Sequence, residues 1–137
     1  MKKSSRNIII LVAAIIVIGL IVVGIYGWKV WFAYNQPPRI TIINNSPEKI
    51  SEVLIEGRGC SASIGKLDPD ENSTVILYPF SASGLEVSFR SKDGKIHKKS
   101  DLAYIEPKGG YFVIVHVTSK QNIEVFRTGI MLHQDTL

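Results

Sequence analysis

The sequence lacks a second cysteine, because Cys60 is the one cysteine among 137 residues. An intramolecular disulfide is therefore excluded, and any folded domain must be held together by its hydrophobic core. A domain of roughly 100 residues can bury such a core, although its free energy of unfolding would be modest. Cys60 itself is expected to be buried as a small hydrophobic side chain.

The sequence also lacks the patterns that specify a reaction. No serine lies in a G-x-S-x-G context, and the segment Gly57 to Cys60 is too short for a phosphate-binding loop. The acidic run from Asp68 to Asn72 is without the glycine and the distal glutamate of a calcium loop. We therefore predict a protein that is not an enzyme and has no catalytic, cofactor or metal site.

Histidine is scarce, and the three that occur, His97, His116 and His133, each stand alone in the sequence. A zinc or copper site needs several ligands. Only His116 and Cys60 lie where predicted strands could bring them together, since both are in or beside strands. A metal or redox chaperone that uses Cys60 and a histidine is therefore kept as an alternative function.

Charged residues and proline are absent from Ile8 to Tyr26, a run of 19 residues. As a helix this run is about 28 Å long, close to the hydrocarbon thickness of about 30 Å. A cleavable signal peptide has a shorter apolar region of about 7–15 residues and a small-residue cleavage site, which this sequence does not offer. The pattern predicts an uncleaved signal anchor, with a transmembrane helix over residues 8–27.

Aromatic residues are concentrated at the end of this run and in the segment 28–38 that follows it. Rings with one polar edge favour the headgroup layer, so a membrane-interface collar is predicted. Its members are Tyr26, Trp28, Trp31 and Tyr34. Pro37 and Pro38 follow, and a Pro-Pro pair forbids continued helix and predicts a short, stiff spacer.

Acidic residues are missing ahead of the apolar run, where Lys2, Lys3 and Arg6 form a basic tail over residues 1–7. The positive-inside rule then favours an amino terminus in the cytoplasm and a domain outside the cytoplasmic (inner) membrane, in the periplasm of a Gram-negative cell. Without these three, 13 basic residues face 12 acidic ones. We expect the tail to bind the lipid bilayer and expect no nucleic-acid partner.

Helical periodicity is lacking from residues 39–137, where short apolar runs alternate with turn residues every eight to twelve positions or so. Strands are predicted over residues 39–43, 50–56, 61–67, 74–79, 85–90, 95–99, 111–118 and 122–127. The expected fold class is all-β: a small immunoglobulin-like antiparallel β-sandwich, tethered by one N-terminal transmembrane helix. The cysteine and tryptophan pattern of true immunoglobulin domains is missing.

Two strands carry the clearest patterns. Leu85, Val87 and Phe89 alternate with polar residues, which predicts a half-buried strand followed by a hairpin turn at residues 92–94. The run Tyr111 to Val117 is apolar on both faces, which is typical of a central strand.

One basic cluster stands out in the predicted domain. It comprises Arg90, Lys92, Lys95, Lys98 and Lys99, offset only by Asp93. Lysines on a hairpin keep the protein soluble and discourage unwanted strand pairing. Contact with anionic lipid headgroups or an acidic partner is the alternative.

Two tripeptides, starting at Asn44 and Asn72, match the acceptor pattern for N-glycosylation, which matters only in a eukaryotic secretory pathway. Taken together, an anchor and a domain without catalytic residues predict a non-enzymatic protein-interaction subunit of the cell envelope. Its partner would be another envelope protein or a secreted protein. An immunity-type protein that neutralises an extracytoplasmic toxin is a second alternative.

Overall fold

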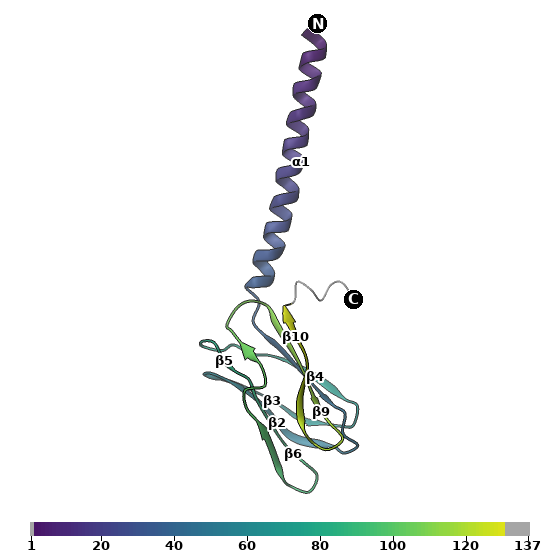
Figure 1. The fold of residues 1–137 in the computed structure, drawn as a ribbon, viewed down its shortest axis with the longest axis vertical. Helices are drawn as coiled ribbons and strands as arrows, with labels where there is room; N and C mark the ends of the chain where they lie inside the picture. Colours follow the sequence, from purple (N-terminus) through teal and green to yellow (C-terminus); the bar gives the residue numbers. More distant parts are fainter. Residues whose placement is uncertain (1, 131–137) are drawn as a thin grey trace. The chain divides into compact units, whose positions relative to one another are not determined.

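The computed structural model describes residues 2–130, with side chains from Arg6 onward. The chain divides into two compact units, Met1–Ala33 and Tyr34–Leu137, each described by itself below (Figure 1). The expectations for Lys2, Lys3 and His133 fall outside the described side chains.

The first unit is one helix. α1 covers Lys2–Tyr34, so it continues through the aromatic residues that follow the apolar run. The proline pair ends it, because the ring of Pro37 restricts the preceding residue and neither proline has an N–H to donate. Within α1, Arg6–Tyr34 is long and apolar enough to cross a membrane, and none of it is buried.

The second unit is built from strands. One four-stranded sheet has the order β10-β9-β1-β4 and a second has the order β3-β2-β6-β7. The first sheet contains β1 (Arg39–Asn44), β4 (Asn72–Ile76), β9 (Tyr111–Val117) and β10 (Ile123–Ile130). The second contains β2 (Ile50–Gly57), β3 (Cys60–Leu67), β6 (Glu86–Arg90) and β7 (Ile96–Lys99). The prediction of a β-rich fold is confirmed, and all eight predicted strands are present.

The expectation of a purely antiparallel fold is wrong at one pair. β1 runs parallel to β9, with Arg39 opposite Phe112 and Asn44 opposite Val117. Alternation along each strand reports which face is buried, but it carries no information about the direction of a distant neighbour. Two short strands, β5 (Ser83–Gly84) and β8 (Tyr104–Ile105), were also not predicted, and they pair with each other.

One hydrophobic core lies between the two sheets. The first sheet contributes Ile40, Ile42, Val113, Val115, Val117 and Ile123; the second contributes Ile50, Val53, Ile55, Leu67, Val87 and Phe89. Val113 and Val115 are fully buried, which confirms residues 111–117 as a central strand. Leu85 and Val87 are also fully buried, as the alternation predicted.

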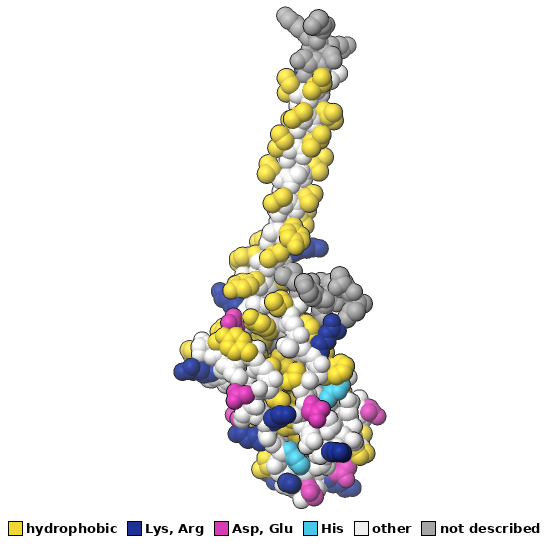
Figure 2. All heavy atoms as spheres, viewed as in Figure 1, with side chains coloured by type: hydrophobic (Ala, Val, Ile, Leu, Met, Phe, Trp, Pro, Cys, Tyr) yellow, Lys and Arg dark blue, Asp and Glu magenta, His cyan; other side chains and the backbone are white. Residues whose placement is uncertain are grey.

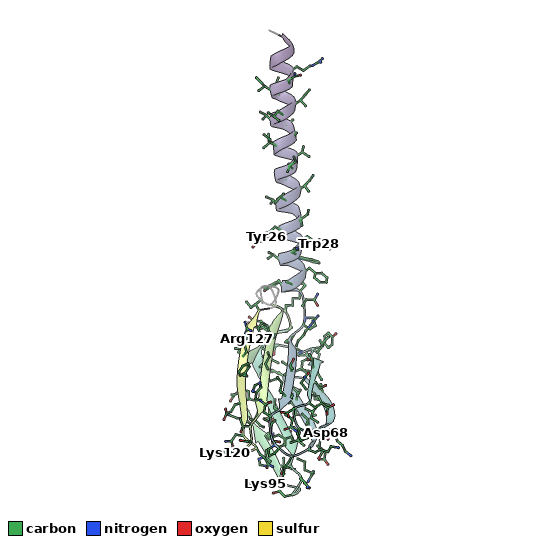
Figure 3. All side chains as sticks on the ribbon, turned by 90° about the vertical axis from the view of Figure 1, so that its right-hand side faces the viewer. Tyr26, Trp28, Asp68, Lys95, Lys120 and Arg127 are labelled. Atoms are coloured by element: carbon green, nitrogen blue, oxygen red, sulfur yellow. The ribbon has the colours of Figure 1, made fainter. Side chains whose placement is uncertain are left out.

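The two ends of the domain differ. We call the end that holds residues 34–39 and the loops 57–59, 78–84 and 104–110 the tether end. The other end carries the turns at residues 45–49, 68–71, 91–95 and 118–122. Figure 3 labels Asp68, Lys95 and Lys120 at that far end, with Arg127 toward the tether end.

Candidate interaction surface on the outer face of β2 and β6

An irregularity in β2 shapes the outer face of its sheet. The pairing of β2 with β3 shifts between Ile50 and Val53, and its pairing with β6 shifts between Ser51 and Leu54. Glu52 is the extra residue, in the left-handed region with φ 50°. Such a conformation costs a non-glycine residue roughly 1–2 kcal/mol, so the packing of the neighbouring strands must hold it in place.

Beside this bulge the sheet carries a hollow of about 490 Å³. Its apolar part is formed by the side chains of Leu54, which is half-buried, and Ile96, which is 61% exposed. Its polar part consists of Ser51, Glu52, Ser63, Gly65, Lys66, Ser88 and Arg90. An exposed isoleucine beside charged groups of both signs is suited to binding a side chain of another protein.

A fixed ion pair borders the hollow. Arg90 Nε lies 2.9 Å from Glu52 Oε2, and the same guanidinium donates a hydrogen bond of 3.0 Å to the carbonyl oxygen of Gly94. Both side chains are exposed, so the pair contributes at most about 1 kcal/mol to stability. It does fix the position of the guanidinium, which leaves a defined charge pattern at the border.

The predicted basic cluster is not gathered into one surface. Arg90 pairs with Glu52, Lys98 Nζ lies 2.6 Å from Glu86 Oε1, and Lys99 donates to the carbonyl oxygen of Ile123 at 3.0 Å. Lys98 and Lys99 point to opposite sides of β7, because side chains alternate along a strand. The Lys98 hydrogen bond lowers the pKa of Glu86, and Glu86 in turn raises the pKa of Lys98.

Lys92 and Lys95 lie in the β6–β7 turn. Gly94 has φ 83° there, and its N–H donates to the carbonyl oxygen of Ser91, so the predicted hairpin turn is confirmed. Asp93 accepts hydrogen bonds from the hydroxyl of Ser91 and the N–H of Lys95, and these lower its pKa. Both lysines are exposed and form no ion pair within the part of the chain that the structure describes.

The predicted collar residues all lie on α1 and are exposed. Tyr26 and Trp28 are labelled in Figure 3, and the rings of Trp28 and Trp31 have centroids 5.4 Å apart. Trp28, Trp31 and Tyr34 follow one another at intervals of three residues, so they share one side of the helix, and Tyr26 lies on another side.

Cys60 and His116 belong to different sheets. Cys60 begins β3, is half-buried and packs against the core, whereas His116 lies on β9 and contacts Asn45 at 2.9 Å. The His116 ring stacks on Phe126 with centroids 4.3 Å apart. Among the described residues no three His, Cys, Asp or Glu side chains are grouped to hold a metal ion. The geometry gives the metal or redox chaperone no support.

Comparison with known proteins identifies a solved structure with a similar fold. No protein-family model and no curated protein matches the sequence. A solved structure described as the NMR structure of the protein from Eubacterium rectale is similar, with a TM-score of 0.50. The similarity covers 67% of this chain and 87% of that chain at 12% sequence identity, so it shows the fold alone.

The sequence did not reveal the hollow. Its apolar members, Leu54 and Ile96, come from strands far apart in the chain, and the β2 bulge that places Glu52 beside Arg90 depends on the pairing of three strands. Ile96 gave the one available signal, since it is a large apolar residue in a hairpin otherwise rich in lysine.

Proposed function

We propose that this chain is a membrane-anchored, non-enzymatic adaptor that binds another protein of the cell envelope through the hollow beside β2. The observation that carries the proposal is the combination of exposed Ile96 and half-buried Leu54 with the Glu52–Arg90 ion pair. Stable protein interfaces have this anatomy, with a small apolar centre and a polar rim.

The anchor is part of the proposal. α1 is of sufficient length and hydrophobicity to span a bilayer, and the belt of Tyr26, Trp28, Trp31 and Tyr34 supports an interface at its carboxyl-terminal end. By the positive-inside rule, Arg6 and the preceding lysines favour an amino terminus in the cytoplasm. The domain would then lie outside the inner membrane, in the periplasm of a Gram-negative cell.

The immunoglobulin-like assignment also belongs to the proposal. It is supported by two four-stranded sheets that share one core, while the parallel β1–β9 pair departs from a simple antiparallel arrangement. Domains of this class commonly present an outer sheet face or their loops to partners. The fold by itself does not specify a partner.

The partner's chemistry follows from the hollow. Its volume of about 490 Å³ accommodates one or two large apolar side chains. Lys66 would attract an acidic group beside them, whereas the charge of Arg90 is already paired with Glu52. The partner should therefore present a leucine-sized or aromatic side chain next to an Asp or Glu.

Site-specific photocrosslinking in native membranes tests this proposal. We expect a crosslinking residue at Ser88, inside the hollow, to give a discrete adduct, and one at Glu124, on the exposed edge strand β10, to give none. Ile96→Asp should remove the Ser88 adduct. Lys92→Asp is the matched control, because it alters the same hairpin outside the hollow and should leave the adduct unchanged.

Adducts that form equally at both positions, or that survive Ile96→Asp, would contradict the proposal. The captured protein also distinguishes the two binding functions. An assembly component of the envelope indicates an adaptor, whereas a secreted toxin indicates an immunity-type protein.

A further inference from the structure

Three aromatic side chains are exposed at the tether end of the domain. Tyr78 is 71% exposed, Phe80 is 87% exposed and Tyr104 is 58% exposed. None of the three takes part in the core, and none lines the hollow beside β2. Figure 2 shows hydrophobic side chains gathered toward this end of the domain. Water is an unfavourable environment for a phenylalanine ring exposed to this extent.

The backbone at Phe80 and at Tyr104 is paired with neighbouring segments of the domain. The N–H of Phe80 donates to the carbonyl oxygen of Arg58 at 2.9 Å, and Gly59 lacks the Cβ that would lie 2.9 Å from the Phe80 ring. Tyr104 is opposite Gly84 in the β5–β8 pair. We call the exposed side chains of Tyr78, Phe80 and Tyr104 at the tether end the aromatic rim.

The aromatic rim lies close to the start of the domain. The N–H of Leu77, next to Tyr78, donates to the carbonyl oxygen of Pro38 at 3.1 Å. Gly109 and Gly110 donate to the carbonyl oxygens of Tyr34 and Gln36, at 2.5 and 3.1 Å. Tyr34, the last residue of α1, is thus hydrogen-bonded into the domain that carries the rim.

Chain length limits where this end of the domain can lie. Residues 35–38 reach at most about 14 Å even when fully extended. With α1 across a bilayer, the tether end is therefore next to the headgroup layer. The far end is separated from it by the six residues of β1, about 20 Å of strand.

We propose that Tyr78, Phe80 and Tyr104 insert into the phospholipid headgroup layer and hold the tether end of the domain against the membrane. This inference rests on the proposed anchor. Tyrosine rings favour this layer, as the collar residues on α1 do, and a phenylalanine ring favours its boundary with the acyl chains. The exposed Arg58 and Lys108 lie on neighbouring loops where they can contact phosphates. The Tyr104 hydroxyl donates to Glu106 at 2.9 Å, so its polar group is satisfied on the domain side.

Depth measurements on the purified full chain in lipid nanodiscs test the inference. One nitroxide label is attached at position 16, 80, 95 or 126 in a Cys60→Ser background. The rate at which the label collides with oxygen is then compared with the rate at which it collides with a water-soluble nickel complex. We expect position 80 to be more accessible to oxygen, as in lipid. Position 95 at the far end and position 126, an aromatic residue on β10 that is 67% exposed, should be more accessible to nickel.

If the label at position 80 has the same accessibility to oxygen and nickel as the label at position 126, the inference is overturned. A rim that binds a protein absent from the nanodisc would also give this result. Position 16, within α1, distinguishes the two failures. If it is lipid-accessible while position 80 is aqueous, the rim fails and the anchor stands. If it is aqueous, the anchor fails as well.

A second set of variants tests the three rings directly. Replacing Tyr78, Phe80 and Tyr104 together by serine should move a label at Lys108 from lipid to water, whereas Phe126→Ser should leave it in place. All four side chains are exposed, so the fold of the domain should persist in both variants. An unchanged depth at position 108 in the triple variant would contradict the proposal.

Discussion

Asn44 is a fully buried polar residue that joins three segments at the far end of the domain. Its side-chain amide donates to the carbonyl oxygens of Glu48, Leu67 and Asp68, and its oxygen accepts from the N–H and hydroxyl of Ser46. The sequence suggested a glycosylation acceptor at this position, but a buried side chain in the folded domain cannot carry a glycan. Asn72, the other candidate, is exposed.

We expect Asn44→Ala to lower the free energy of unfolding by about 3 kcal/mol, because it leaves several buried polar groups without partners. Asn45→Ala is the matched control. Its side chain is exposed and makes one contact, to His116, so a change of about 0.5 kcal/mol or less is expected. Urea denaturation of the full chain in detergent micelles measures both, and equal effects would refute the structural role of Asn44.

Glu86 makes stability depend on pH. Its pKa is lowered from 4.5, first by the hydrogen bond from Lys98 and then by that from Ser100. A lowered folded-state pKa stabilises the domain above the ordinary value, and this contribution is lost as the pH falls through the folded pKa. In the Glu86→Gln variant, we expect the free energy of unfolding to decrease less steeply as the pH falls below about 4.5. If the free energies of unfolding of wild type and Glu86→Gln change in parallel between pH 6 and pH 3, the Glu86 carboxylate makes no such contribution.

At the scale of elements, the β6–β7 hairpin was fully readable from the sequence. Alternation of Leu85, Val87 and Phe89 fixed the buried face, and Asp93-Gly94 fixed the turn. β2 was readable only in part. Its apolar residues predicted a strand, but no local pattern places an extra residue at Glu52, because the bulge results from simultaneous pairing with β3 and β6.

At the hairpin turn, the energetic cost of a backbone conformation can be measured without a change in side-chain packing. A Cβ at Gly94 would meet no other atom within 4 Å, so Gly94→Ala should cost only the left-handed conformation, roughly 1 kcal/mol. Gly94→Asn should cost less, since asparagine tolerates this region better. Urea denaturation of both variants measures the order, and an alanine variant as stable as wild type would contradict the positive φ.

At the scale of the whole molecule, the chain divides between Ala33 and Tyr34 rather than at Arg39, where the sequence placed the start of the domain. The reason is hydrogen bonding across the spacer. The carbonyl oxygens of Tyr34, Gln36 and Pro38 accept bonds from Gly109, Gly110 and Leu77. These contacts involve residues distant in sequence, so composition could not place the boundary.

We expect a fragment that starts at Tyr34 to fold without α1, and a fragment that starts at Arg39 to be less stable by about 3 kcal/mol. The shorter fragment lacks three backbone acceptors, each worth about 1 kcal/mol. Circular dichroism and urea denaturation compare the two. Equal stability would show that the spacer is not part of the domain.

The sequence by itself determined the features that depend on local patterns: one long apolar helix, a β-rich domain, eight of its strands, and the turns with glycine or acidic residues. Periodicity and turn chemistry are encoded by neighbouring residues, which is why these could be predicted. Only the tertiary structure decided the parallel β1–β9 pair, the burial of Asn44, the dispersal of the lysine cluster and the hollow beside Glu52. Each of these depends on strands brought together from distant parts of the chain, whose direction and register a single strand's pattern does not specify.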